Sequence, residues 1–354
     1  MRILRRYLFR VVVSRTLLVL AVLISLAGFF ELISQLDNLG EGSYGLAEAF
    51  FYVLLKTPRK IFVILPMAAL IGSLLGLGAL AAHSEIIVMR AAGISTWRLA
   101  GALAATGLVL SVIALAIGDF VSPAAEGYAR QFRALARSGQ AALRPGTASW
   151  IRDGDTFINL GQPDEELRFG GVTLYRVDNG ALAAVAHADS VEVTEDEQWV
   201  LNNFAETRFL DDGVVVHRVA RLLEPKNLDA ELLALMEVKR TTLIDQQLRR
   251  YIAYLKRNGL DARRYETAYW SRIMGSLAIV PMILIGLPLS FGSLRNAGSG
   301  ARLVVGLAIG LAYFLGSQTL ADGGAVFGLS PALIAALPVL VLTAVVGLML
   351  WRAR

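Results

Sequence analysis

Long apolar runs alternate along the chain with short stretches that hold most of its charges. A helix needs about 20 mostly apolar residues to cross a bilayer, and six uncharged runs approach or reach that length. They are Thr16–Phe30, Ile61–Ala82, Leu99–Gly118, Ile273–Leu294, Leu303–Ala321 and Leu329–Trp351. The first run extends to about Leu36 if Glu31 is tolerated. The pattern predicts an α-helical membrane protein with six transmembrane helices.

The first 15 residues have an amphipathic pattern of their own. Apolar residues fall at helical spacing opposite several arginines, at Ile3, Leu4, Tyr7, Leu8, Val11 and Val12. This favours a helix in the membrane interface before the first span, although a frayed basic tail fits the pattern too. The apolar run that follows is long for a signal peptide and lacks a clear cleavage site, so we expect it to be retained.

The stretch between the third and fourth runs is polar enough to form a water-soluble domain. Short alternating strands are separated by turn sequences at Asp153-Gly154, Asp178-Asn179-Gly180 and Asp212-Gly213. This pattern is typical of a β-sandwich or jelly roll. A helical stretch then returns to the fourth run, with Leu243, Leu248, Ile252 and Leu255 on one face.

Three parts follow from these patterns. Residues 1–122 form a first membrane part with three spans, and residues 269–354 form a second with three more. Residues 123–268 between them form an inserted all-β, jelly-roll-like domain with its helical return.

The composition supports a membrane protein. Hydrophobic residues make up 55% of the chain and the mean hydropathy is +0.56, which is rare for a soluble domain of this length. A net charge of +5 would also suit nucleic acid, but the positive residues flank apolar runs, so we expect no nucleic-acid partner. The chain has no cysteine, which excludes disulfides and thiolate chemistry.

Arginines in the short loops predict how the spans are oriented. They lie at the N-terminus, after the second and fourth spans, and at the C-terminus: Arg2, Arg5, Arg6, Arg10, Arg90, Arg98, Arg295, Arg302, Arg352 and Arg354. The loop between the fifth and sixth spans has Asp322 and no Lys or Arg. Both termini are then cytoplasmic, and the inserted domain is periplasmic if the protein is bacterial.

The sequence lacks motifs for catalysis. No G-x-x-x-x-G-K-[ST] motif occurs, so the chain has no P-loop for ATP. His187 and His217 lie in predicted strands without the spacing of metal ligands. We therefore expect neither an enzyme nor a cofactor in this chain.

Several glycines have the spacing of close helix packing. Gly76–Ala81 matches a loose dinucleotide fingerprint, but it lies inside an apolar run and follows no strand. We interpret it as a packing face, like Gly72-x-x-x-Gly76 and Gly306-x-x-x-Gly310.

Charged residues at the span ends are few. A short helix is predicted over residues 84–92, with Ser84 as its cap, Glu85 in its first turn and Gly93 at its end. From the residues alone, Glu85 complements the N-terminus of its own helix. Glu31 and Asp119 lie near the outer ends of the first and third spans, where we favour a solvated structural role over a functional one.

Four stretches together resemble a known family. "PMAALIGSLLGLGALAAHSEIIVMRAAGIS", Pro66 to Ser95, is similar to the lipopolysaccharide export permeases of the LptF/LptG family. "QLDNLGEGSYG", from Gln35, resembles the LptG branch in particular. "IGDFVSPAAEGYARQFRA" after the third span and "YIAYLKRNGLDARRYETAYWSRI" before the fourth match as well. The resemblance covers essentially the whole chain, in order.

The resemblance implies a bacterial inner-membrane subunit of an ABC transporter. Such a permease pairs with an LptF-type permease, is powered by an LptB-type ATPase dimer that binds ATP and Mg, and extracts lipopolysaccharide. It passes the lipid to periplasmic jelly-roll proteins of the LptC and LptA types. The missing P-loop agrees with an ATPase site on a separate subunit.

The resemblance also implies roles for particular residues. The helix at 84–92 becomes a coupling helix, with Ser84, Glu85, Ile86, Ile87, Met89 and Arg90 toward the ATPase. Arg130 and Arg133 match positions that contact the lipid headgroup, and Gly306, Gly310 and Gly316 give the fifth span a smooth, movable surface at a lateral gate. The first span departs from the family pattern, because some members carry lysines where this chain has Glu31, Asp37 and Asn38.

Other functions fit parts of the sequence. A permease for lipoproteins or peptides would share the short charged helix, and a membrane-anchored periplasmic scaffold or sensor would not need it. An LptF-type partner is a further alternative, whereas an intramembrane enzyme lacks an acid pair or metal cluster on facing spans.

Overall fold

The computed structural model divides the chain into two compact units, each described here by itself. One comprises Met1–Gln140 and Arg263–Arg354, and the other Ala141–Ala262. The described residues are 2–40, 42–138, 149–160, 169–178, 181–193, 199–210, 213–224, 245–291, 298–324 and 328–352.

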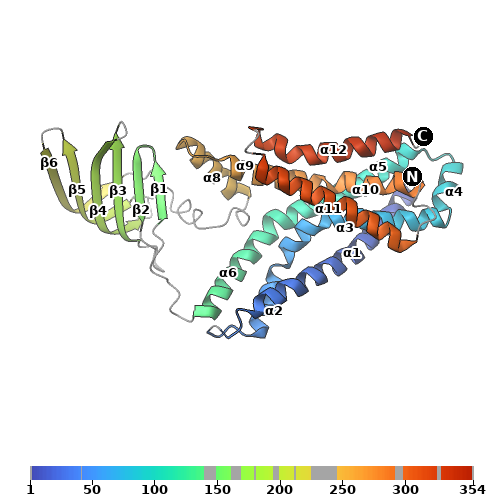
Figure 1. Cartoon of the computed structure of the whole chain (residues 1–354), viewed down its shortest axis with the longest axis horizontal. Helices are drawn as coiled ribbons and strands as arrows, with labels where there is room; N and C mark the ends of the chain where they lie inside the picture. The colour runs from blue at the N-terminus through green and yellow to red at the C-terminus, as the bar shows by residue number, and fades with distance from the viewer. Residues whose placement is uncertain are drawn as a thin grey trace. The chain divides into compact units, whose positions relative to one another are not determined.

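The first unit is helical, and among the described residues six helical segments are long and apolar enough to cross a membrane. They are α1 (Arg2–Leu36), α3 (Thr57–Ala82), α5 continuing into α6 (Thr96–Arg133), α9 with α10 (Arg263–Phe291), α11 (Ser299–Gly323) and α12 (Pro331–Arg352). Two shorter helices, α2 (Leu46–Leu55) and α4 (Glu85–Ala91), connect them (Figure 1). The six predicted spans are confirmed as helices, and the chain is a multi-pass membrane protein.

Three helices extend beyond the predicted runs. Helix α1 continues without a break from Arg2, so the helical part of the N-terminal prediction is confirmed, and its place at a membrane surface stays a prediction. The third span does not end at Asp119: α5 (Thr96–Ala116) passes through a π-helical turn, η1 (Ile117–Val121), into α6 (Ser122–Ser138). The fourth begins at Arg263 as α9 (Arg263–Leu277) and continues as α10 (Ile279–Phe291), and residues 292–297 lie outside the described part.

A charge pair explains two of these extensions. Asp119 Oδ1 lies 3.9 Å from Arg272 Nη1, and the Arg272 side chain is 12% exposed. A prediction based on the length of an apolar run ends the span at the first charged residue. A charged residue that pairs with an opposite charge on another helix can instead lie within the span. Asp119 is therefore a half-buried ion-pair partner: the pairing agrees with the expected structural role, but the side chain is only partly solvated.

Helix α1 packs closely on α3, which supplies much of the core of the helical unit. A Cβ on Gly72 would lie 2.5 Å from the Thr16 Cα, and one on Gly76 would lie 3.2 Å from Val11 Cγ1. The glycines therefore let the two backbones approach, as their spacing predicts. Ile71, Leu74, Leu77 and residues of α10 such as Met282 are almost fully buried around this crossing.

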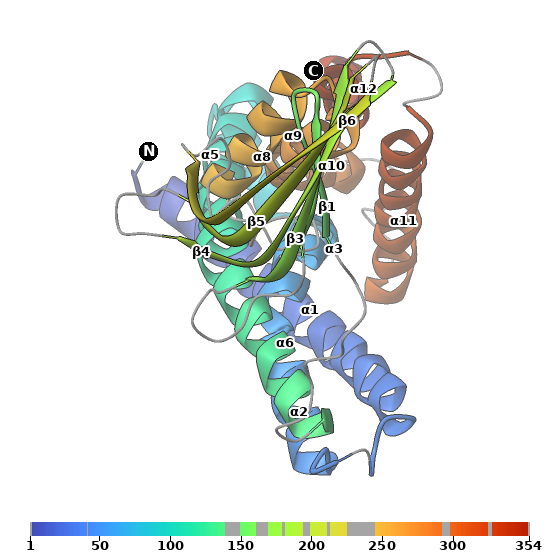
Figure 2. The ribbon, with the colours of Figure 1, turned by 90° about the vertical axis from the view of Figure 1, so that its left-hand side faces the viewer.

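The second unit contains a single antiparallel sheet in strand order β1-β2-β3-β4-β5-β6. The strands are β1 (Ser149–Asp153), β2 (Thr156–Leu160), β3 (Phe169–Asp178), β4 (Ala181–Val193), β5 (Trp199–Leu210) and β6 (Gly213–Glu224). Every strand pairs with its neighbour in sequence, so the described sheet is a meander whose longer strands bend along their length (Figure 2). The inserted all-β domain is confirmed.

The predicted turns lie between paired strands. Asp153 pairs with Thr156 across the first turn, where Gly154 has a φ of +57°. Asp178 pairs with Ala181, and Leu210 pairs with Gly213. Residues 179–180 and 211–212 themselves lie outside the described part.

Helix α8 (Asp245–Arg257) follows the sheet as the predicted helical return. Leu248 and Leu255 are buried and Ile252 is half-buried, while Leu243 lies outside the described residues. His187 is paired with Thr173 and lies 3.8 Å from Asp189. No group of three potential metal ligands occurs in the described part of the chain.

The compact units divide the chain differently from the predicted parts. The β unit covers Ala141–Ala262, so residues 123–140 and 263–268 of the predicted inserted domain belong to the helical unit. Contacts of α6 explain this, because Ala136 O accepts hydrogen bonds from Ser43 N and Oγ, and Glu126 pairs with Arg59.

Candidate functional site

Helix α4 is shorter than predicted and begins without a side-chain cap. Ser84 occupies the N-cap position, but its φ is +61° and its hydroxyl makes no capping hydrogen bond. The other end agrees with the sequence. Gly93 has a φ of +84° and donates to Arg90 O, while Ile94 N donates to Met89 O, which together form a Schellman motif.

Glu85 is held by a side chain from the first helix. The Tyr7 hydroxyl donates to Glu85 Oε2 at 2.7 Å. Glu85 therefore does more than complement its own helix, because the bond ties the start of α4 to the start of α1. The Tyr7 bond is made to Oε2. A carboxylate can accept several bonds at once, so Glu85 can still accept a bond from a partner at Oε1.

The apolar residues of α4 divide between core and surface. Ile86 is 2% exposed and packs in the helical core, so it anchors the helix and, unlike Ile87, is not presented toward an ATPase. Ile87 and Val88 are exposed, and Met89 is partly buried against the same core. Exposed apolar residues beside an acid are suited to protein contact.

Beside α4 the surface forms a hollow of about 370 Å³. Arg90, Gly93 and Trp97 contribute to its lining. The Arg90 guanidinium lies 5.2 Å from the Phe291 ring centroid, which holds it in a cation–π contact at the end of α10. This end of the helical unit therefore offers an acid, a cation, an exposed aromatic ring and a hollow together.

Removing the Tyr7 hydroxyl is expected to loosen α4 without unfolding the protein. In Tyr7→Phe, the Glu85 carboxylate loses one partly exposed hydrogen bond, so amide exchange in residues 85–91 rises about fivefold. Hydrogen–deuterium exchange with mass spectrometry measures this. Tyr128→Phe, at an exposed tyrosine outside this region, is the control. Equal exchange of α4 in the two variants would show that the bond does not hold the helix.

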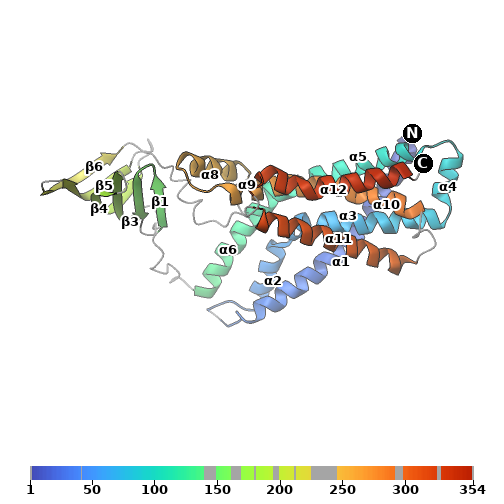
Figure 3. The ribbon, with the colours of Figure 1, turned by 45° about the horizontal axis from the view of Figure 1, so that its top comes forward.

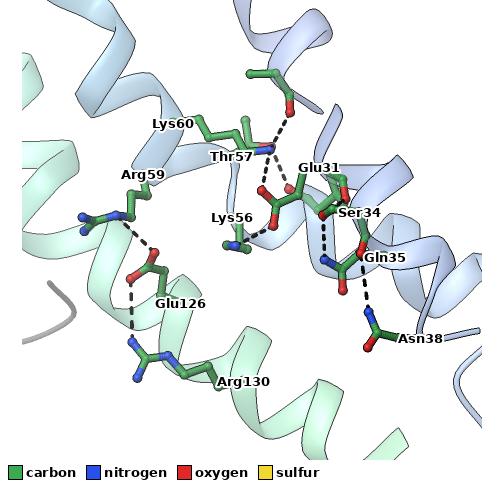
Figure 4. A network of polar contacts seen from close by, with 12 residues as sticks. Glu31, Ser34, Gln35, Asn38, Lys56, Thr57, Arg59, Lys60, Glu126 and Arg130 are labelled. Carbon is green, nitrogen blue, oxygen red and sulfur yellow. Dashed lines mark hydrogen bonds and ion pairs between the residues drawn. The ribbon is translucent and has the colours of Figure 1, made fainter. Parts of the chain in front are cut away.

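A second polar cluster lies where α1, α3 and α6 meet (Figure 4). Lys56 Nζ donates to Glu31 Oε1 at 2.6 Å, and Lys60 Nζ lies 3.6 Å from Glu31 Oε2. Lys60 also donates to Ala27 O at 3.0 Å. Glu31 is thus ion-paired to the first turn of the next span and is not simply solvated.

The second acid of this cluster is Glu126 on α6. Its two carboxylate oxygens lie 3.4 Å from Arg59 Nε and 3.9 Å from Arg130 Nη2, and the side chain is 10% exposed. Arg133 lies one turn beyond, with its guanidinium 5.2 Å from the Tyr52 ring centroid. The Arg133 Nε is shielded from solvent and makes no hydrogen bond within the described part of the chain.

We define an outer cluster of seven residues, named for the side of the membrane that the loop arginines predict for it: Glu31, Glu126, Lys56, Arg59, Lys60, Arg130 and Arg133. Four of its five cations pair with its two carboxylates, and the fifth, Arg133, lies over the Tyr52 ring, so cations outnumber acids among these residues. Burial lowers the pKa of Lys56, but the hydrogen bond to Glu31 and the nearby Tyr52 raise it by more than burial lowers it. The pKa of Lys56 therefore lies above its ordinary value. Lys56 therefore stays charged at neutral pH, and the cluster attracts anions.

Sequence reasoning missed Lys56, Arg59 and Lys60. Their signal is "KTPRK" at residues 56–60, which gathers three positive charges just before the second apolar run. The loop that ends with these residues also contains acids, so its overall charge is mixed and does not reveal the local excess of positive charge. Arg130 and Arg133 come from α6, and the structure brings both to the same region as these cations.

Helix α11 packs on α3 through one face in its first half. A Cβ on Gly306 would lie 3.0 Å from atoms of Ile71 and Leu74, and one on Gly310 would lie 2.8 Å from Met67 Cγ. Arg302 is 6% exposed, and its Nε lies 2.5 Å from where a Gly78 Cβ would be. Gly316 has no neighbour within 4 Å of its Cβ position. Two predicted gate glycines are thus packing positions, and the third is open.

Comparison with known proteins decides the family. A family model described as "Lipopolysaccharide export system permease LptF/LptG" matches residues 6–352. The chain belongs to the LptF/LptG family. Its resemblance to that family, argued above from four stretches, is therefore confirmed.

Curated relatives agree with the LptG branch. Lipopolysaccharide export system permease protein LptG of Escherichia coli K12 is 31% identical over 339 residues, covering 95% of this chain and 94% of that protein. The LptG protein of Haemophilus influenzae Rd is 28% identical over 351 residues, covering 99% and 98%.

The cations of the outer cluster come from residues 56–60 and from α6, whereas the first span supplies the acid Glu31. This agrees with the departure of Glu31, Asp37 and Asn38 from the lysines that the resemblance implies for some family members. Glu31 instead holds Lys56 and Lys60 of the second span in place.

Proposed function

We propose that this chain is a permease subunit of an ABC transporter that extracts lipopolysaccharide from the inner membrane. The family supports an export permease, and the outer cluster is the observation that carries the substrate assignment. An LptF-type permease, an LptB-type ATPase dimer and LptC-type and LptA-type periplasmic proteins complete the transporter in this proposal.

The two polar regions lie at opposite ends of one helix. Helix α3 begins at Thr57, beside the outer cluster, and ends at Ala82, just before α4. Its 26 residues span about 39 Å, which exceeds the hydrocarbon thickness of a bilayer. Figures 1 and 3 show α4 at one end of the helices and α2 and α6 at the other. The arrangement suits a protein that acts on both membrane faces.

The outer cluster suits the headgroup of lipopolysaccharide. Phosphates bind arginine and lysine through short charge-assisted hydrogen bonds, and arginine can present two donors at once. Glu31 and Glu126 orient the cations but neutralise only part of their charge. Arg130 and Arg133 are the headgroup ligands we propose, and Lys56, Arg59 and Lys60 complete the positive surface.

The opposite end suits a cytoplasmic ATPase. Glu85 can accept a bidentate bond from a partner arginine, while Ile87 and Val88 fill an apolar groove. ATP and Mg bind to that separate ATPase in this proposal, and this chain supplies no catalytic group. With α4 cytoplasmic, both termini are cytoplasmic and the β unit is periplasmic, where it hands the lipid to the next jelly-roll protein.

Reversing charge in the outer cluster is expected to abolish most lipopolysaccharide binding. The double variant Arg130→Glu, Arg133→Glu replaces two phosphate ligands with repelling acids, so extraction falls at least about a hundredfold, as two lost charge-assisted bonds predict. The assay follows ATP-dependent release of lipopolysaccharide from proteoliposomes holding the transporter with all its partners.

Two controls separate this effect from misfolding. Arg257→Glu reverses an exposed charge on α8 and leaves release unchanged, and Arg130→Lys, Arg133→Lys keeps most of it. Full release by the double glutamate variant would remove the outer cluster from substrate binding. Release of a lipoprotein or peptide but not of lipopolysaccharide would favour the alternative exporters, and the absence of any ATPase in the purified complex would favour a scaffold.

A further inference from the structure

A cavity of about 410 Å³ lies between helices of the helical unit and is partly open at its surface. Residues of α3, α9, α10, α11 and α12 line it, including Phe62, Met67, Gly275, Phe314 and Ala335. Its volume falls within the range of about 300–1,000 Å³ that is usual for ligand pockets. No described residue of α1 lines the cavity, so the cavity is separate from the contact between α1 and α3.

The cavity forms where α11 loses its close contact with α3. Arg302, Gly306 and Gly310 follow one another at four-residue intervals and bring the first half of α11 against α3. Gly310 and Met67 are the last close pair, and both already line the cavity. The next position at that interval is Phe314, whose side chain is too large to continue the close contact.

The lining has an apolar body and one polar edge. Carbon-rich side chains from α3 and α12 form most of the wall, and Tyr313, Ser317 and Gln318 supply the polar atoms on α11. The Ser317 hydroxyl is shielded from solvent and lies within reach of the Tyr313 phenol, so these two side chains form the polar edge together. A hydroxyl in such a site can bond to an oxygen of a ligand.

We propose that this cavity binds one acyl chain of a bilayer phospholipid, with its ester group at Ser317. All five lining helices belong to membrane-spanning segments, so lipid is the ligand with direct access to the site. An acyl chain matches the apolar body, and the ester carbonyl matches the polar edge. The inference rests on the membrane placement of the helices and not on the proposed export substrate.

A bound chain would also support α11. This helix is buried along only a narrow face, at Arg302, Gly306 and Gly310, and its second half borders the cavity. Filling a cavity restores the contacts that its lining lacks. The phospholipid therefore holds the second half of α11 in the observed position, and its departure frees that half to move.

A photoreactive phospholipid tests the site directly. The full transporter is reconstituted with phosphatidylglycerol that carries a diazirine in its acyl chain, irradiated, and analysed for labelled peptides. We expect labels on α3, α11 and α12 at lining residues such as Met67, Phe314 and Ala335. Excess unlabelled phosphatidylglycerol lowers these labels but not those on the lipid-exposed surface of α12.

A filling variant and a matched variant make the test sharp. Gly275 lines the cavity and has no neighbour within 4 Å of its Cβ position, so Gly275→Phe fills the space without backbone strain. Gly101→Phe makes the same change at an equally open, exposed glycine of helix α5. Cavity labels fall about tenfold in the first variant, equivalent to a loss of 1.4 kcal/mol, and stay unchanged in the second.

Two results would overturn the proposal. One is cavity labelling in Gly275→Phe equal to that in Gly101→Phe. The other, which needs no variant, is that unlabelled lipid fails to compete in the wild-type complex. Lipopolysaccharide release by the wild-type complex, measured in parallel, tests the export function separately, because a transporter can release its substrate whether or not this site holds lipid.

Discussion

Glu85→Lys is expected to eliminate ATP-dependent lipopolysaccharide release while the protein remains folded. The substitution replaces the acid of α4 with a cation, which repels the partner arginine that we propose docks there. Removing one partner of a buried charge pair at an interface costs about 2–5 kcal/mol, so ATPase association falls by about thirtyfold or more. Co-purification of the ATPase and release from proteoliposomes measure the two effects together.

The Tyr7 bond makes a precise control possible. Tyr7→Phe leaves the Glu85 carboxylate in place and removes only its internal partner, so release persists at a large fraction of the wild-type rate. Glu85→Gln keeps the shape and the Tyr7 contact but loses the charge, and we expect an intermediate loss. If Tyr7→Phe impairs release as strongly as Glu85→Lys, the acid acts by fixing α4 to α1 and not by binding the ATPase.

The six spans could be predicted because apolar length is a property of the chain itself. Each uncharged run became a helix, and Gly72 and Gly76 became a packing face as their spacing indicates. The ends were harder to predict, because they depend on partners distant in sequence. Asp119 and Arg272 are 153 positions apart, yet their pairing allows both helices to pass the point where charge would otherwise end them.

The same limit applies to the candidate site. Glu85 and Arg130 can be picked out from the sequence as charges near the ends of spans. The partner of Arg130, Glu126, lies four residues away and is predictable from helical spacing, whereas the partner of Glu85, Tyr7, is distant in sequence and is not. Ile86 was indistinguishable from Ile87 in the sequence. Burial separates them, since a seven-residue helix must turn one residue toward its own core to stay attached. Exposure is therefore what selects Ile87 and Val88 as contact residues.

The packing of α11 links the fold to the proposed transport. A span that moves during transport needs a contact that is close but narrow, because a wide interface would resist movement. Helix α11 has such a contact at Gly306 and Gly310, whereas the α1–α3 crossing at Gly72 is enclosed by core residues. The two glycine faces therefore differ in what an added side chain would meet: mainly side chains of α3 at Gly306 and Gly310, but the backbone of α1 at Gly72.

Gly72→Leu is accordingly expected to prevent stable folding. Its Cβ would lie 2.5 Å from the Thr16 Cα and 2.6 Å from the Thr16 N, and Thr16 is fully buried. Backbone cannot move aside as a flexible side chain can, so the helices must separate, at a cost of about 3 kcal/mol or more. Size-exclusion yield and the thermal unfolding midpoint in detergent measure the loss.

Gly347→Leu is the matched control, because the Cβ position of this glycine in α12 has no neighbour within 4 Å. It gains a side chain of the same size in a membrane-spanning helix, so any general effect of added apolar volume appears there too. We expect its yield and unfolding midpoint to equal those of the wild type. Equal midpoints for Gly72→Leu and Gly347→Leu would mean that α1 and α3 can move apart at their crossing without loss of the core. The close approach at Thr16 would then not be what holds these two spans together.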